Sequence, residues 1–136
     1  MSKVYPACYN LPMSSLEQIQ AKALSFADRR EWLRYYTPRG VVLGLLVELG
    51  ELAEHVQYLD GQELQDYVQA HRQEIGDELA DVLYWVLVTA DTMGVDLEES
   101  FHHKMAKNAL KYPEPTSGKR VGKLVTKLER EAMAKS

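Results

Sequence analysis

The sequence has few of the residues that cross-link or interrupt a fold. Cys8 is the only cysteine among 136 residues, which excludes an internal disulfide and the thiolate-rich zinc patterns. Its 5 prolines and 8 glycines fall at only a few places, and the alternation of apolar and polar residues that marks strands is almost absent. We therefore expect an all-α domain with its own apolar core in a reducing, cytoplasmic environment.

The sequence also lacks long apolar runs and a positive net charge. Its longest apolar stretches, near VVLGLLV and VLYWVLV, are far too short to cross a bilayer, and the first dozen residues lack the apolar run of a secretory signal. The formal net charge is −4, and basic residues concentrate after Pro113, so the body is acidic. These features predict a soluble protein and argue against membranes and duplex nucleic acid as partners.

Hydrophobic spacing and capping signals predict a bundle of four helices. A Ser-x-x-Glu capping box at Ser14–Glu17 precedes the first helix, and Asp96–Glu99 has the same form before the fourth. Residues 62–70 are polar and form either a loop or the first turns of the third helix. The expected helices span residues 15–36, 39–59, a segment ending at 93, and 96–111. This organisation gives a bundle domain over 1–113 and a basic tail over 114–136, which is either a short helix or disordered.

Two pairs of acids lie inside the most apolar of these helical stretches. Glu48 and Glu51 form one pair, and Glu78 and Asp81 form the other. Residues three apart share a helix face, so each pair directs two carboxylates the same way. Four anions among apolar residues need a cation, and Mg²⁺ prefers oxygen ligands and shares its shell with phosphates. The sequence therefore predicts a magnesium site formed by these four residues.

The alternative for each pair is a solvated stripe on an amphipathic helix, which is the commoner role of Glu-x-x-Glu. The flanking residues argue against it, because apolar residues from Val41 to Leu52 cover every side of the second helix. We therefore expect this helix to be buried and its acids to face an interior cleft. Two nearly all-apolar helices also leave surface to bury between subunits, which predicts a homodimer or a homotetramer.

The acidic pairs resemble the signature of the MazG-like all-α nucleotide pyrophosphohydrolases, which include the dCTP pyrophosphatases. That signature is Glu-x-x-Glu, a variable spacer and Glu-x-x-Asp, and Glu48–Glu51 and Glu78–Asp81 match its two halves. The flanking segments FADRREWLRYYTPRG and KMAKNALKYP are similar to the family as well, so the likeness spans residues 24–113. It implies that a nucleoside triphosphate and water become a monophosphate and pyrophosphate, with Mg²⁺ held by the four acids.

The resemblance also implies a phosphate and sugar site after the second acidic pair. Lys104, Asn108 and Lys111 recur at helical spacing, and Lys111 and Tyr112 fall in the Lys/Arg-Tyr-Pro ending of the family. Without the resemblance, an ordinary basic helix end, favourable with the helix dipole, would be the simpler interpretation. With it, these four residues become candidates for binding the substrate.

Base binding needs flat apolar surfaces, and several aromatic residues lie close to the signature. Trp32 lies where related dCTP pyrophosphatases place a base-pocket tryptophan, and Trp85 lies one turn beyond Asp81 on the same helix face. Aromatic residues more often belong to a core, but the resemblance favours these two as substrate-binding residues. The expected substrate is dCTP or another pyrimidine deoxynucleotide, removed as part of nucleotide-pool house-cleaning.

Two other functions compete with this interpretation. A di-iron carboxylate bundle requires two Glu-x-x-His pairs, and only Glu99–His102 has that form. A non-catalytic helical interaction or regulatory module would keep the bundle and lose turnover. The intact acid quartet argues against that module, and magnesium-dependent nucleotide turnover would eliminate it.

Overall fold

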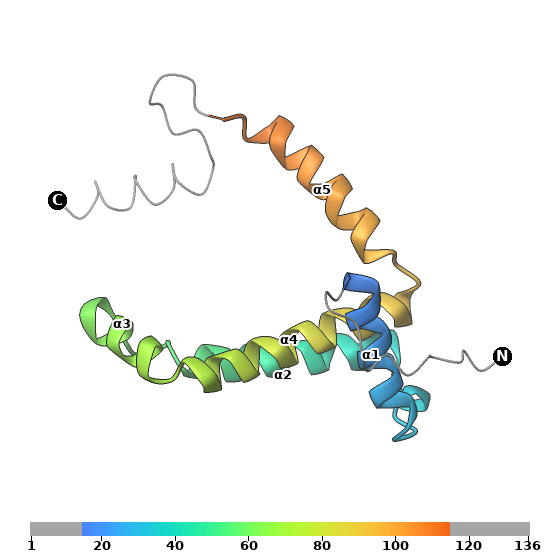
Figure 1. The fold of residues 1–136 in the computed structure, drawn as a ribbon, viewed down its shortest axis with the longest axis horizontal. Coiled ribbons are helices and arrows are strands. Elements are labelled where there is room, and N and C mark those ends of the chain that lie inside the picture. Colours follow the sequence, from blue (N-terminus) through green and yellow to red (C-terminus); the bar gives the residue numbers. More distant parts are fainter. Residues whose placement is uncertain (1–14, 115–136) are drawn as a thin grey trace. The chain divides into compact units, whose positions relative to one another are not determined.

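The regular elements of the described residues are all helical, as expected. The computed structural model describes residues 15–114, so nearly all of the expected basic tail lies outside it. None of the helices in this range is long and apolar enough to cross a membrane. The elements are α1 (Leu16–Asp28), the short 3-10 helix η1 (Leu33–Tyr35), α2 (Pro38–Glu54), α3 (Gly61–Ala70), α4 (Arg72–Met93) and α5 (Leu97–Lys111) (Figure 1).

The start of α1 is capped one residue later than expected. Gln18 N–H donates to Ser15 Oγ over 3.3 Å, and Ser15 N–H donates to Gln18 Oε1 over 2.9 Å. The capping box is therefore Ser15–Gln18, while the expected box at Ser14–Glu17 begins outside the described residues. Two of the N–H groups that the helix start leaves without a backbone partner find a side-chain acceptor in this way.

The predicted end of the first helix is wrong, because the chain turns before Tyr36. The helix ends at Asp28, and Glu31 follows in the left-handed region with φ 58. Trp32 N–H donates to Ala27 O over 3.0 Å across this turn. A non-glycine residue at such a φ is uncommon and breaks helical geometry. The turn places Trp32 and η1 beyond the end of α1.

The second helix was expected to reach Leu59 but ends at Glu54, where a turn over residues 55–58 begins. The other boundaries follow local capping chemistry. Thr37 caps α2, since its Oγ1 accepts from Gly40 N–H over 3.1 Å. The polar stretch expected as loop or helix is the separate helix α3, which His71 divides from α4 with φ −108 and ψ 29. Gly94, with φ 67, ends α4 in the left-handed conformation that glycine adopts without steric cost. The fourth expected helix agrees with α5.

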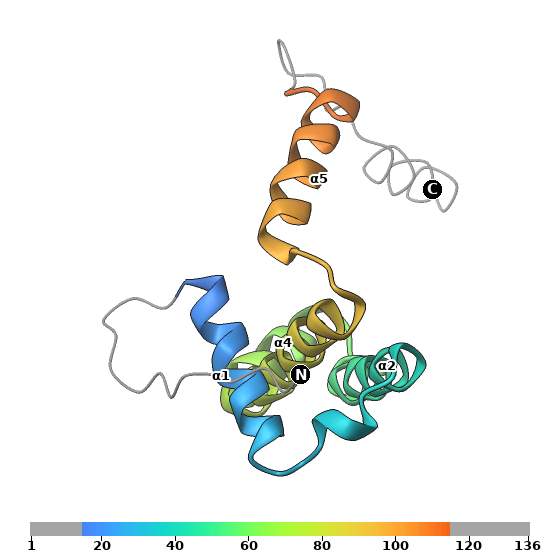
Figure 2. The same ribbon diagram turned by 90° about the vertical axis from the view of Figure 1, so that its right-hand side faces the viewer.

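The described residues divide into two compact units, the first ending at Leu97 and the second beginning at Glu98. In the first unit α4 packs against α1, α2 and α3, and Figure 2 shows α1 and α2 on different sides of α4. The buried cluster draws on three of these helices and consists of Ala23, Leu24, Val41, Leu87 and Val88. This packing fixes α4 against α2, the two helices that carry the acidic pairs.

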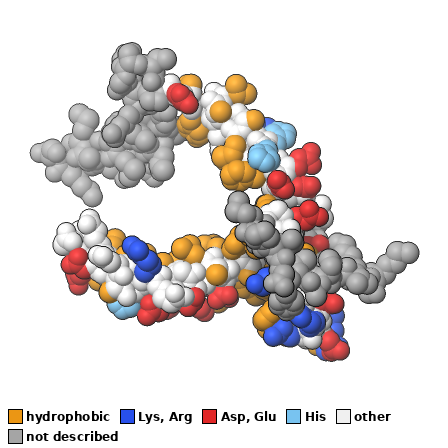
Figure 3. All heavy atoms as spheres, in the orientation of Figure 1, with side chains coloured by type: hydrophobic (Ala, Val, Ile, Leu, Met, Phe, Trp, Pro, Cys, Tyr) orange, Lys and Arg blue, Asp and Glu red, His pale blue; other side chains and the backbone are white. Residues whose placement is uncertain are grey.

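The expectation that α2 is buried on every side is wrong for the single chain. Val41 is its only fully buried residue, whereas Leu46 and Val47 are each 58% exposed and Leu43 is 51% exposed. The reason is that α2 packs against α4 along one side, which leaves its other apolar sides open. Figure 3 shows apolar side chains gathered along the α2–α4 pair.

Candidate functional site

Three of the four predicted acids converge where α2 packs against α4. Glu48 on α2 and Glu78 and Asp81 on α4 each offer a carboxylate oxygen, and these oxygens all lie within 4.8 Å of one another. Glu48 and Glu78 are partly buried, while Asp81 is exposed. The helical spacing of each pair sets the direction of its side chains, and the packing of the two helices brings them together.

Glu51 lies one turn beyond Glu48 on α2 and is exposed. Its carboxylate is outside the group of three converging oxygens. The negative charge of Glu48, and to a smaller extent that of Glu78, nevertheless raises the pKa of Glu51 above its ordinary value. A nearby like charge makes ionisation of a carboxyl group less favourable. Glu51 is therefore coupled electrostatically to the other acids, although its carboxylate lies outside the converging group.

The donor set suits a hard divalent cation. Glu78 Oε2 is buried and has no hydrogen-bond partner among the described residues. A buried carboxylate oxygen without a partner is costly unless it neutralises a cation. Carboxylate oxygens are the ligands that Mg²⁺ and Ca²⁺ prefer, and Mg²⁺ needs only a few of them from the protein. The site therefore fits the magnesium ion that the sequence predicts.

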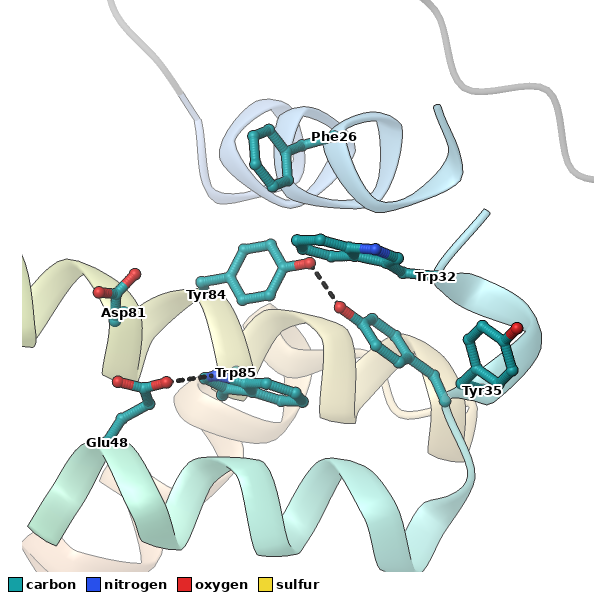
Figure 4. Close-up of a pocket in the computed structure, with 8 residues that line it drawn as sticks. Phe26, Trp32, Tyr35, Glu48, Asp81, Tyr84 and Trp85 are labelled. Carbon is teal, nitrogen blue, oxygen red and sulfur yellow. Dashed lines mark hydrogen bonds between the residues drawn. The ribbon is translucent and has the colours of Figure 1, made fainter. Parts of the chain in front are cut away.

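An aromatic pocket of about 480 Å³ opens directly beside the acids (Figure 4). It forms where α1, the turn after it, η1, α2 and α4 meet, so it depends on the early end of α1. Both tryptophans that the sequence predicted as substrate-binding line this pocket. The lining residues are Phe26, Trp32, Tyr35, Tyr36, Glu48, Asp81, Tyr84 and Trp85.

Two tyrosines place a polar group inside this pocket. The hydroxyl oxygens of Tyr36 and Tyr84 lie 2.7 Å apart and share a hydrogen bond. Burial of Tyr84 and this hydrogen bond raise the pKa of its hydroxyl well above the usual range, so the Tyr84 hydroxyl stays protonated near neutral pH. Sequence reasoning did not select this pair, because residues 48 apart carry no local signal of contact.

The pocket and the acid group share a hydrogen bond. Trp85 Nε1–H donates to Glu48 Oε1 over 3.1 Å, which joins α4 to α2 (Figure 4). The indole also packs against Tyr36 with ring centroids 5.6 Å apart and edge-on against Tyr84 at 5.8 Å. The residues predicted for base binding and for metal binding are therefore in direct contact at this point.

The predicted phosphate-binding residues belong to the second compact unit, whereas the converging acids and the aromatic pocket belong to the first. Lys104, Asn108 and Lys111 lie on α5, and Tyr112 follows directly. Tyr112 N–H donates to Asn108 O over 2.8 Å, and Lys111 Nζ lies 5.5 Å from the centroid of the Tyr112 ring. The shared helix face of Lys104, Asn108 and Lys111 follows from the helical conformation of α5. Their contact with a substrate stays a prediction.

Comparisons with known proteins identify the family to which this chain is similar. The model of the MazG nucleotide pyrophosphohydrolase domain matches residues 36–115. The chain is 35% identical over 104 residues to dCTP pyrophosphatase 1 of Mus musculus and 36% identical to dCTP pyrophosphatase 1 of Homo sapiens, in each case over 75% of this chain. It spans 61% of the length of these relatives.

The fold is also similar to that of a solved pyrophosphatase structure. The crystal structure of a pyrophosphatase from Archaeoglobus fulgidus superposes with a TM-score of 0.69 at 29% sequence identity. The match covers 79% of this chain and 100% of that chain. The matched family segment contains both acidic pairs and extends over α2, α3, α4 and α5.

Proposed function

Because the chain belongs to the MazG nucleotide pyrophosphohydrolase family, we propose that it hydrolyses a nucleoside triphosphate to a monophosphate and pyrophosphate with Mg²⁺. The observation that carries this proposal is the convergence of Glu48, Glu78 and Asp81 beside an aromatic pocket. A nucleotide has an anionic phosphate chain and a flat base, so it needs a cation and an aromatic surface side by side. The site offers both.

Each part of the site has a distinct role in this proposal. Glu48, Glu51, Glu78 and Asp81 hold magnesium, which when bound supplies charge neutralisation for the phosphates and lowers the pKa of an attacking water. One of these carboxylates accepts the proton of that water as general base. No covalent intermediate with the protein is required. The bundle domain over 1–113 carries the whole reaction, in the cytoplasm, as removal of unwanted nucleotides.

The substrate-binding residues divide between base and phosphates. Trp32 and Trp85 provide faces on which a base stacks, and such stacking contributes about 1–3 kcal/mol per base in proteins that bind single strands. Lys104, Asn108, Lys111 and Tyr112 bind the phosphates and the sugar, with Lys104 and Lys111 supplying positive charge.

The proposed substrate is a pyrimidine deoxynucleotide, with dCTP as the leading candidate, and the hydroxyl pair in the pocket offers groups that can bind its base. One proton of the Tyr36–Tyr84 pair lies in the bond between the hydroxyls, which leaves one proton to donate and several lone pairs to accept. The Watson–Crick edge of cytosine presents an adjacent acceptor and donor, which this pair matches. Uracil and thymine present the same two groups in reversed order, and rotation of the hydroxyls accommodates them. The preference for a pyrimidine rests on the relatives named dCTP pyrophosphatase, because adenine and guanine also present a donor beside an acceptor.

A second copy of the chain covers the apolar sides of α2 in this proposal, which gives a homodimer or a homotetramer. Leu43, Leu46 and Val47 are all more than half exposed in the single chain. Burying a large apolar side chain contributes roughly 1.5–3 kcal/mol. Burying these residues against another apolar surface is therefore expected to stabilise the protein, and a second copy of the chain is the simplest partner that provides such a surface.

Leu46→Glu is expected to lower the molar mass in solution to that of a smaller assembly, because a charge would be buried in the interface. Multi-angle light scattering during size-exclusion chromatography measures this change. Gln65→Glu, on the exposed surface of α3, is the matched control and is expected to keep the wild-type mass. An unchanged mass for Leu46→Glu would place the interface elsewhere.

The proposed activity is tested by pyrophosphate release from a panel of ribo- and deoxynucleoside triphosphates, with magnesium and with chelator. We expect metal-dependent release with a monophosphate as the other product, and faster turnover of pyrimidine than of purine deoxynucleotides. Absence of turnover for every nucleotide, in folded and magnesium-loaded protein, would instead support a non-catalytic helical interaction module.

A further inference from the structure

Trp85 lines the aromatic pocket and also contacts a predicted metal ligand. Its Nε1–H donates to Glu48 Oε1 over 3.1 Å (Figure 4). An indole N–H is a donor only, and a bond to an ionised carboxylate is stronger than one between neutral groups. Glu48 is in turn one of the three residues whose carboxylate oxygens converge. The bond therefore acts on the orientation of an acid within that group.

The backbone of α2 is shaped to receive this indole. A Cβ atom at Gly44 would lie 2.5 Å from Trp85 Cζ3 and 2.6 Å from Cη2, distances at which side chains overlap. Gly44 and Glu48 are four residues apart and share a face of α2. The benzene edge of the indole thus lies against Gly44 while its nitrogen edge meets Glu48. Glycine inside a helix lowers its stability relative to alanine, and here it makes room for the ring.

Two further rings limit rotation of the indole. Tyr36 packs against it at a tilt of 43°, and Tyr84 packs edge-on at 90°. These tyrosines are joined by their own hydrogen bond of 2.7 Å. With its benzene edge at Gly44 and two tyrosine rings packed against it, Trp85 directs its N–H toward Glu48.

We propose that Trp85 is a positioning residue that fixes the Glu48 carboxylate for a divalent cation. The N–H holds one carboxylate oxygen in place before a cation binds. The Glu48 side chain therefore loses less conformational entropy on cation binding than a freely rotating side chain would. This role rests on the proposed magnesium site and is separate from stacking against a base. It also links the two halves of the site, because the ring that lines the nucleotide pocket orients a metal ligand.

Isothermal titration of Mg²⁺ into nucleotide-free protein tests this role without any contribution from base stacking. Trp85→Phe keeps an aromatic ring and removes the N–H, and it is expected to weaken Mg²⁺ binding about 10-fold, the low end for outer partners of metal ligands. Tyr67→Phe is the matched control, since it removes a side-chain hydrogen bond to His55, a residue outside the group of converging carboxylates. It is expected to bind Mg²⁺ as the wild type does.

Gly44→Ala provides a second test that leaves both hydrogen-bonding groups in the chain. The added methyl group displaces the indole, so this variant is also expected to weaken Mg²⁺ binding. In Trp32→Phe, Trp85 is the only tryptophan left, because the chain has 2. Its fluorescence is then expected to change on titration with Mg²⁺, as the environment of its N–H partner changes.

The outcomes separate this role from the proposed function. If the wild type binds Mg²⁺ and Trp85→Phe binds it with the same affinity, the role of Trp85 is overturned and the metal site stands. Magnesium binding without any change in Trp85 fluorescence would do the same. A wild type that binds no divalent cation would overturn the metal site and, with it, this role.

Discussion

Asp81→Asn is expected to lower magnesium-dependent pyrophosphate release at least about 1000-fold, which corresponds to about 4 kcal/mol of transition-state stabilisation. Asp81 supplies one of the three converging carboxylate oxygens, and an amide offers a neutral oxygen in place of an anionic one. The side chain is exposed, so the change leaves no buried polar group without a partner, and the fold is expected to survive. Initial rates at saturating nucleotide and magnesium measure the loss.

Asp77→Asn is the matched control for this substitution. Asp77 lies one turn earlier on α4, is exposed, and accepts a hydrogen bond from Gln73 Nε2 over 3.0 Å. Asp77→Asn removes one negative charge from α4, as Asp81→Asn does, but at a residue outside the converging group. Turnover close to that of the wild type is therefore expected. Circular dichroism of both variants shows whether the helices are retained. Wild-type turnover by Asp81→Asn would refute the assignment of this site.

Magnesium is expected to raise the melting temperature by roughly 10 °C at 100 times its dissociation constant. Binding at that concentration contributes about 2.7 kcal/mol, and each kcal/mol shifts the melting temperature by roughly 2–8 °C for domains of this size range. The physical source is relief of repulsion among carboxylates held within 4.8 Å of one another. Differential scanning calorimetry with magnesium and with chelator measures the shift, and Glu78→Gln is expected to lose most of it.

The raised pKa of Glu51 gives this stability effect a pH dependence. In the metal-free folded protein Glu48 and Glu78 raise that pKa above the ordinary 4.5. The contribution of Glu51 to stability is therefore most favourable below pH 4.5 and is lost as pH rises through the raised pKa. At neutral pH the folded protein carries the repulsion, and a bound cation offsets it.

Glu51→Gln isolates this contribution. The metal-free variant is expected to be more stable than the metal-free wild type at pH 7, and the difference is expected to vanish near pH 4. It is also expected to gain less stability from magnesium and to lose turnover. Thermal melts of both metal-free proteins across that pH range measure the difference in their melting temperatures. Parallel pH profiles for both proteins would contradict the coupling of Glu51 to its neighbours.

Several features of this protein follow from the sequence alone. Helical spacing and capping residues predicted an all-α chain, and the bounds of α5 agree with the expected fourth helix. The spacing of three residues within each acidic pair fixes a shared helix face wherever the helix lies. The ordered acidic pairs resembled the MazG-like family, and the family match covers both of them. These signals are local, so they need no knowledge of how the helices pack.

Only the tertiary structure decided how these elements meet. The turn at Glu31 ended α1 early and brought Trp32 to the pocket, whereas periodicity had continued the helix to Tyr36. The convergence of three acids without Glu51 depends on how α2 packs against α4.

The bonds that join the two halves of the site were equally out of reach of sequence reasoning. Trp85 and Glu48 are 37 residues apart, and Tyr36 and Tyr84 are 48 apart. The exposed apolar sides of α2 likewise show that an all-apolar helix can be buried by one neighbour on one side only. Periodicity reports which residues share a face, whereas the depth of burial and the distance between faces are set by packing against other elements.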